Sequence, residues 1–176
     1  MKLRIHSNQV GLFAMLLLSG AAYAQLPDDG EAPQHHDFKV TSDLKDASHP
    51  YYNQGSPEGF VVDGVQGKTL VVVRGKTYTF GIDTGVMHDF YLSTKPKGWG
   101  GSVLTAGVDH NFTYKGTTTF RPSAETQNEV YYACRNHQYM GGKIMVVNPG
   151  EEGKAQAAIE AEIKERKERQ AQGATP

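Results

Sequence analysis

Residues 131–142 read Tyr-Tyr-Ala-Cys-Arg-Asn-His-Gln-Tyr-Met-Gly-Gly, and the architecture of the chain can be worked out from them. An apolar, aromatic run leads into a short loop that carries a thiol at Cys134, an imidazole at His137 and a thioether at Met140. Soft sulfur donors together with imidazole suit copper as Cu(I) and as Cu(II). The two closing glycines let the backbone turn tightly into a further strand. The stretch therefore predicts a metal-binding loop between two strands.

A second imidazole is needed to complete a copper site of this kind, and it should come from another strand. His88 is the candidate, because it precedes the strand-like residues 89–93 and follows turn residues at 83–85. In such a site two histidines and one cysteine form a near-trigonal plane, and a methionine is the weak axial ligand. We therefore expect one copper ion bound by four residues: His88, Cys134, His137 and Met140.

Each of these residues also has a simpler explanation. A lone cysteine is often a small buried side chain, a lone histidine is often a hydrogen-bonded surface residue, and a lone methionine often fills the core. A zinc site of Cys134, His88 and His137 is the metal alternative, but it would leave Met140 without a role. A haem-attachment motif is excluded because residue 131 is Tyr rather than Cys. The combination of four donors favours copper.

Short β-branched and aromatic runs separated by glycine extend outward from the loop, from about residue 59. Such runs, with turn residues between them, predict seven or eight strands in an antiparallel sandwich or barrel. The runs are 60–62, 69–73, 77–82, 90–93, 111–114, 117–120, 130–133 and 143–147.

The stretch from Val61 to Val147 resembles a cupredoxin, with His88 upstream and the Cys134/His137/Met140 loop between the last two strands. This resemblance implies an all-β, Greek-key, cupredoxin-like β-sandwich over residues 59–149. It also implies a type 1 copper site that cycles between Cu(I) and Cu(II). In that site Cys134 would supply the covalent Cu–S bond, the ring edge of His137 would be the exit for the electron, and Met140 would tune the potential.

Finer likenesses point within the family. The two-residue gap before Met140 resembles the ligand loop of amicyanin. Residues 49–53 and 132–137 are similar to periplasmic copper-tolerance cupredoxins of the CopI type. Asp89 departs from the usual pattern, in which a neutral residue follows the first histidine, and a change there can alter hydrogen bonding around the metal.

The first 24 residues have the pattern of a secretory signal peptide. Lys2 and Arg4 are followed by an apolar run at 10–18 and by Ala22-Tyr23-Ala24, a small-x-small cleavage site. The run is too short to span a membrane, which takes about 20 residues. We therefore expect a periplasmic protein cleaved after Ala24 and not membrane-spanning. Without Lys2 and Arg4 it has 16 basic and 19 acidic side chains, a formal charge of −3.

Residues 25–58 are rich in Pro, Gly, Asp and His and show neither helical nor strand periodicity. They predict a flexible, His-containing arm. A second copper site is the alternative to a plain solvated arm, because imidazoles bind copper. The histidines that could build it are His35, His36, His49 and His110.

Residues 150–176 change to Ala, Glu, Lys and Arg and predict a charged helical tail. Opposite charges recur four residues apart, as at Glu160 and Lys164, while the apolar stripe is limited to Ala155, Ile159 and Ile163. Such a narrow stripe favours a solvated helix that packs weakly. Docking of a partner on this helix is the alternative.

Composition excludes some functions and leaves three. One cysteine rules out a disulfide scaffold, and 18 basic against 19 acidic side chains argue against nucleic acid as a partner. We expect an electron-transfer protein with a redox protein or Cu(I) as its partner, serving copper tolerance. The alternative is a cuprous oxidase or copper-buffering protein that uses a second site in the arm. A structural or adhesion domain without metal is the third class. Trp99 is either a docking aromatic near the site or a packing residue.

Overall fold

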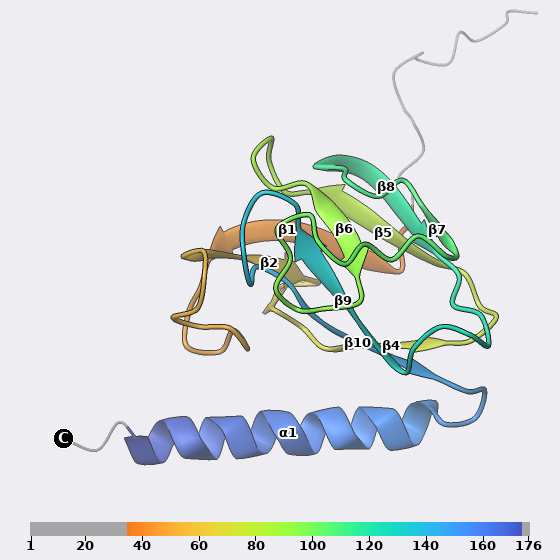
Figure 1. Ribbon diagram of the computed structural model, residues 1–176. Helices are drawn as coiled ribbons and strands as arrows, with labels where there is room; N and C mark the ends of the chain where they lie inside the picture. Colours follow the sequence, from red (N-terminus) through yellow and green to blue (C-terminus); the bar gives the residue numbers. More distant parts are fainter. Residues whose placement is uncertain (1–34, 174–176) are drawn as a thin grey trace, which may run out of the picture. The chain divides into compact units, whose positions relative to one another are not determined.

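The computed structural model describes residues 35–173, so the expected signal peptide at 1–24 lies outside the described residues. The described part consists of two β-sheets and a C-terminal helix (Figure 1). One sheet has the strand order β3-β2-β1-β5-β8-β7, and the other has the order β4-β10-β9-β6. The strands are β1 (Phe38–Leu44), β2 (Glu58–Val62), β3 (Val65–Gln66), β4 (Leu70–Val73), β5 (Tyr78–Asp83), β6 (Phe90–Ser93), β7 (Val108–Asp109), β8 (Lys115–Phe120), β9 (Glu129–Cys134) and β10 (Gly142–Val147).

The core consists of alternate side chains from the strands of both sheets, as expected when each strand buries one face. Aromatic rings dominate its centre: the ring centroid of Phe90 lies 5.4 Å from that of Phe80, 5.8 Å from that of Phe60 and 6.1 Å from that of Tyr132. Cys134 and Met140 belong to the same buried cluster. The all-β sandwich predicted from the sequence is confirmed, and two of the expected ligands lie in its core.

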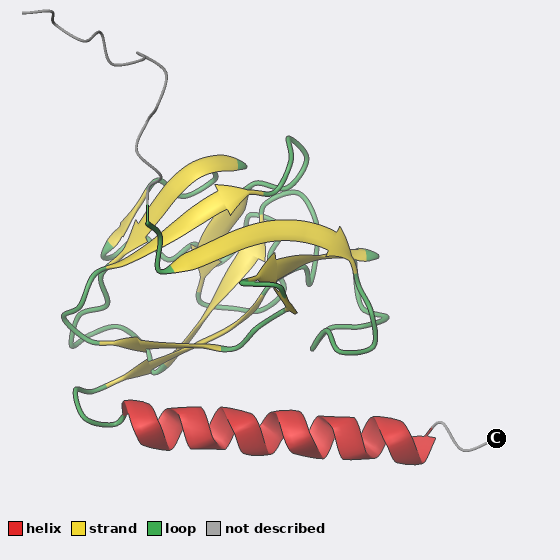
Figure 2. Ribbon diagram, turned by 180° about the vertical axis from the view of Figure 1, so that it is seen from behind, coloured by secondary structure: helices red, strands yellow, loops and turns green. Residues whose placement is uncertain are grey.

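Both sheets are mixed, which corrects the expectation of purely antiparallel pairing (Figure 2). Strand β1 runs parallel to β5, and β4 runs parallel to β10, while the other neighbours are antiparallel. Parallel neighbours need long connections. Here the chain segment that connects the two strands of each parallel pair includes strands of both sheets. Periodicity in the sequence could not reveal this, because it is the same in parallel and antiparallel strands.

The flexible arm expected over residues 25–58 is corrected for its described part, residues 35–58, because the sandwich begins at β1; residues 25–34 lie outside the described residues. Val40 is fully buried, and β1 pairs with β2 on one side and with β5 on the other. Its apolar residues alternate with Lys39, Thr41 and Asp43, so the run satisfies the period of a half-buried strand despite its polar composition. Residues 45–57 also make fixed hydrogen bonds, which are described below.

The strand expected at 111–114 is not formed as such. Thr113 makes only an isolated bridge to Phe90, and the short strand in this region is β7. The Asn111 side chain explains the difference, because it accepts a hydrogen bond from the Leu92 N–H and donates one to the Leu104 carbonyl. A side chain that satisfies backbone groups in this way replaces a strand neighbour.

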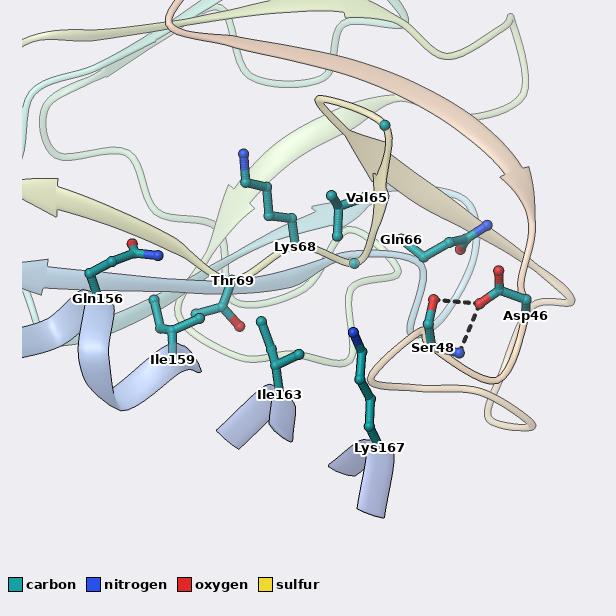
Figure 3. A pocket seen from close by; sticks show the side chains of 12 residues that line it. Asp46, Ser48, Val65, Gln66, Lys68, Thr69, Gln156, Ile159, Ile163 and Lys167 are labelled. Atoms are coloured by element: carbon teal, nitrogen blue, oxygen red, sulfur yellow. Dashed lines mark hydrogen bonds between the residues drawn. The ribbon is translucent and has the colours of Figure 1, made fainter. Parts of the chain in front are cut away.

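Helix α1 (Glu152–Gly173) confirms the predicted helical tail and packs against β4 and β10. Ala155 and Ile159 are buried, whereas Ile163 is 39% exposed. Figure 3 shows Ile159 and Ile163 pointing from the helix toward residues 65–69, across a groove of about 530 Å³. The predicted narrow stripe is therefore the part of the helix that contacts the sandwich. Within residues 35–173, no helix is both long and apolar enough to cross a membrane.

Candidate metal centre

The pairing of β6 with β9 brings the expected ligands to one end of the sandwich. Phe90 lies opposite Cys134 in this register, so His88, two residues before Phe90, lies near the start of the loop that follows β9. That loop, residues 135–141, carries His137 and Met140 and leads into β10. The structure therefore places His88, Cys134 and His137 at one end of this strand pair, and Met140 further along the loop that connects β9 to β10.

Three of the four residues come together closely. One ligand atom each from His88, Cys134 and His137 lie within 4.8 Å of one another. The Cys134 Sγ is 3.8 Å from the His137 Nδ1, and the two imidazole rings have centroids 4.9 Å apart. Within the described residues, this is the only group of three or more His, Cys, Asp or Glu side chains with such spacing. Two imidazoles and one thiolate are the in-plane donors of a type 1 copper site.

The environment of His88 fits a metal ligand. Its Nε2 lies 3.0 Å from a carboxylate oxygen of Glu58, at the start of β2. Its other ring nitrogen, Nδ1, is buried and has no hydrogen-bond partner. An unpaired buried nitrogen costs free energy unless a further partner satisfies it. A metal ion bound at Nδ1 would do so, and a carboxylate on the opposite ring nitrogen is the usual support of a metal-bound histidine.

The thiol of Cys134 is fully buried at the end of β9. Burial raises its pKa, and this outweighs the backbone N–H groups of Asn136 and His137, which act in the opposite direction. The metal-free protein therefore holds a neutral thiol, and a metal ion that binds there displaces its proton. The neighbouring backbone is fixed, because the Trp99 N–H donates to the Cys134 carbonyl and the Arg135 N–H donates to the Asp89 carbonyl.

Met140 is fully buried, and its backbone is held from two sides. Its carbonyl accepts a hydrogen bond from the Phe60 N–H at 2.6 Å and lies 3.2 Å from the His49 Nε2. The glycines that follow are needed sterically: a Cβ on Gly141 would overlap the Tyr132 carbonyl, and one on Gly142 would overlap the Tyr132 side chain. The loop can therefore enter β10 only with glycine at both positions.

The other histidines do not gather into a second cluster within the described residues. His49 is buried among backbone partners, and His36 packs against Gly81. His35 and His110 are exposed. The second copper site therefore remains a hypothesis without a set of converging donors.

Sequence reasoning missed two residues of the centre, Glu58 and Asn136. Glu58 lies 30 positions before His88 in the chain and meets it only through the fold. Asn136 donates from Nδ2 to the Met87 carbonyl at 2.9 Å and so ties the ligand loop to the loop that carries His88. Its position directly before His137 was the one available indication of this role.

Two residues discussed from the sequence have clear positions. The Asp89 side chain is mostly buried and lies 3.9 Å from the Arg135 guanidinium, so its charge has a partner on the ligand loop. Trp99 is 62% exposed, with Lys97 over its ring, so it belongs to the surface rather than the core.

Comparison with known proteins gives structural neighbours only. No family model and no curated protein match the chain. Among solved structures, rusticyanin from Thiobacillus ferrooxidans is similar at 20% identity and a TM-score of 0.39, over 61% of this chain and 75% of that one. A structure described as the copper protein rusticyanin matches at 20% identity and 0.36, over 61% and 76%. Reduced rusticyanin matches at 20% identity and 0.36, over 61% and 77%. The assignment of the metal centre rests on the geometry and donors described above.

Proposed function

We propose that this chain is a type 1 copper protein of the cupredoxin kind that transfers single electrons. The observation that carries the proposal is the convergence of His88, Cys134 and His137 within 4.8 Å. Bound copper would supply a one-electron Cu(II)/Cu(I) couple. Cys134, His88 and His137 would hold the ion in their plane, and Met140 would be the axial donor.

The protein frame supports this role because it holds the donors in place before the metal binds. Cys134 belongs to a paired strand, and Glu58 fixes the ring of His88. The core around Cys134 and Met140 excludes water. A site whose ligands do not rearrange suits rapid electron transfer, because little structure has to change between oxidation states.

The decisive experiment is a copper titration of the purified mature protein, followed by visible absorption, electron paramagnetic resonance and a metal count per chain. We expect one copper per chain and an intense thiolate-to-copper charge-transfer band. A colourless protein that prefers zinc would contradict the proposal. Two coppers per chain, with one lost in the His35→Ala/His36→Ala double variant, would favour the cuprous oxidase or copper-buffering alternative.

The axial role of Met140 has its own test. Met140→Gln replaces a soft thioether with a harder amide oxygen, which favours Cu(II) over Cu(I). We expect copper to remain bound at one per chain and the reduction potential to fall, as measured by voltammetry. Complete loss of copper, or an unchanged potential, would show that Met140 is not a weak axial ligand.

We infer that the partner is a redox protein that docks beside the ligand loop. Exposed apolar side chains lie next to this loop: Met87 is 60% exposed and is tied to it through Asn136, and Trp99 is 62% exposed beside Cys134. Apolar side chains exposed around a half-buried His137 fit a transient contact. Electron self-exchange between two copies gives a test without a known partner. Met87→Glu should slow it through like-charge repulsion, whereas Val65→Glu, on β3 in the groove lined by helix α1, should not.

We further propose that the protein is exported to the periplasm and serves copper tolerance, as its likeness to copper-tolerance cupredoxins suggests. N-terminal sequencing of the mature protein should begin at Gln25. In a strain that lacks the gene, wild type should restore growth on copper, and Cys134→Ser should not. Equal growth with both proteins would contradict a tolerance role that depends on the copper site.

A further inference from the structure

Residues 45–57, which we name the 45–57 excursion, connect β1 to β2 without helix or strand. Internal hydrogen bonds nevertheless give the excursion a fixed shape. The Lys45 ammonium group donates to the carbonyls of Tyr51 and Gln54, and the Lys45 N–H donates to the Pro57 carbonyl. The two ends of the excursion are thereby drawn together.

The excursion contacts three consecutive residues of the ligand loop. The Ser56 N–H donates to the Gln138 carbonyl at 3.0 Å. The ring of Tyr51 lies 5.4 Å from the ring of Tyr139, between centroids. His49 then reaches the carbonyl of Met140. The second half of the ligand loop, up to the expected axial residue, is therefore held against the excursion.

The hydrogen bonds of His49 define its role. The Tyr51 N–H donates to the His49 Nδ1 at 3.0 Å, so Nδ1 carries no proton. The proton of the neutral ring is then on Nε2, which donates to the Met140 carbonyl at 3.2 Å. The imidazole is 2% exposed. It thus bridges the backbone of the excursion to the backbone of Met140.

Two glycines provide the space that the His49 ring occupies. A Cβ on Gly59 would lie 2.6 Å from the His49 Nε2, and one on Gly67 would lie 3.0 Å from the same atom. Both distances are shorter than ordinary carbon–nitrogen contact. The ring therefore fills the space that these glycines leave, and its position is set by the fold rather than by the metal.

We propose that His49 is a positioning residue: through its Nε2–H bond to the Met140 carbonyl, the 45–57 excursion fixes the place from which Met140 reaches the metal. The inference rests on the proposed copper function and assigns His49 a role other than that of an extra copper ligand. A shift of the Met140 backbone would change the axial contact, and the axial contact tunes the potential and colour of such sites.

Three variants separate the two hydrogen bonds. His49→Gln keeps an N–H donor near the position of Nε2, and His49→Asn keeps only an acceptor near the position of Nδ1. His49→Leu keeps neither group. We expect the Leu and Asn variants to retain one copper per chain, with a changed ratio of charge-transfer bands and a shifted potential. His49→Gln should restore both toward wild type.

Thr118→Val is the matched control, because the buried Thr118 hydroxyl also donates to a backbone carbonyl, that of His110, on β8 away from the ligand loop. It should lower the unfolding free energy without altering the spectrum or the potential. His49→Leu with an unchanged band ratio and potential would overturn the proposal. So would a change of equal size in the Thr118→Val protein.

Amide hydrogen exchange of the metal-free protein distinguishes failure of this inference from failure of the copper function. The Phe60 N–H, which donates to the Met140 carbonyl, should exchange about tenfold faster in His49→Leu than in His49→Gln, since a lost hydrogen bond is worth about 1.4 kcal/mol. Equal exchange in the two variants would overturn the positioning role. If the wild-type protein binds no copper while the two variants still differ in exchange, the copper function alone is refuted.

Discussion

The 45–57 excursion and helix α1 are both polar segments outside the strands, yet they are attached to the sandwich in opposite ways. The excursion has no regular structure, and its backbone and side chains bind three residues of the ligand loop. Helix α1 is regular along its whole length but contacts the sheet chiefly through Ala155 and Ile159. Regular secondary structure is thus a poor guide to how firmly a segment is attached to the sandwich. The attachment depends on whether the polar groups of the segment find fixed partners and on how much apolar surface it buries.

The largest expected difference between the two regions comes from changing the metal centre itself. Cys134→Ser should abolish the charge-transfer band completely, because a hydroxyl oxygen cannot replace the soft thiolate. Ala155→Ser makes a similarly small polar change at a buried position of the helix and should leave the band intact. Visible spectra of the two copper-loaded variants provide the check. A band that persists in Cys134→Ser would exclude Cys134 as a ligand.

A smaller effect is expected from Glu58, which supports the metal centre without belonging to its donor set. Glu58→Ala removes the carboxylate that lies 3.0 Å from the His88 Nε2. Copper affinity should fall by about 10–100-fold, the usual effect of losing such support. Competition with a chelator of known affinity measures the change. Glu58→Gln should lose less, because its amide oxygen still accepts a hydrogen bond; equal losses would point to charge alone.

Substitutions in helix α1 should change the unfolding free energy of the protein rather than the absorption spectrum of its copper site. Ile159→Asp places a carboxylate where a buried side chain meets the sheet, and the unfolding free energy should fall by about 1.5–3 kcal/mol with the copper spectrum unchanged. Urea denaturation followed by circular dichroism gives the value. Ile163→Asp, at a position that is 39% exposed, should cost clearly less. A spectral change in Ile159→Asp would show that the helix and the metal centre are coupled.

The smallest effect is expected from the exposed ion pair of the helix. Lys164 and Glu168 are four residues apart, with a nitrogen–oxygen distance of 3.9 Å. Lys164→Ala should change the unfolding free energy by no more than about 0.5 kcal/mol, because exposed pairs of this kind contribute little. The same denaturation assay applies, at low and high salt. A loss above about 1 kcal/mol would mean that the charged face has a structural role.

The convergence of His88, Cys134 and His137 could be predicted because the chemistry of these side chains is local in the sequence. Cys134, His137 and Met140 lie on one loop, and His88 starts a strand that ends beside it. The helix and most of the strands from β2 onward followed from periodicity for the same reason. The signal of each element is contained within the element.

The supporting residues could not be predicted, because they meet the centre only in three dimensions. Glu58 and His49 lie in a segment whose composition indicates flexibility, and neither has a spacing relation to the ligands. Strand β1 was missed because alternate polar residues and flanking Asp and His obscured a short pattern. The parallel pairs of β1 with β5 and of β4 with β10 depend on topology, about which hydrophobic periodicity carries no information.

X-ray absorption spectroscopy at the copper edge of the loaded wild-type protein tests the central claim most directly, because it reports the atoms bound to the metal. The account predicts two nitrogen scatterers and one short sulfur scatterer, with the sulfur lost in Cys134→Ser. A first shell of nitrogen and oxygen alone in the wild-type protein would contradict it.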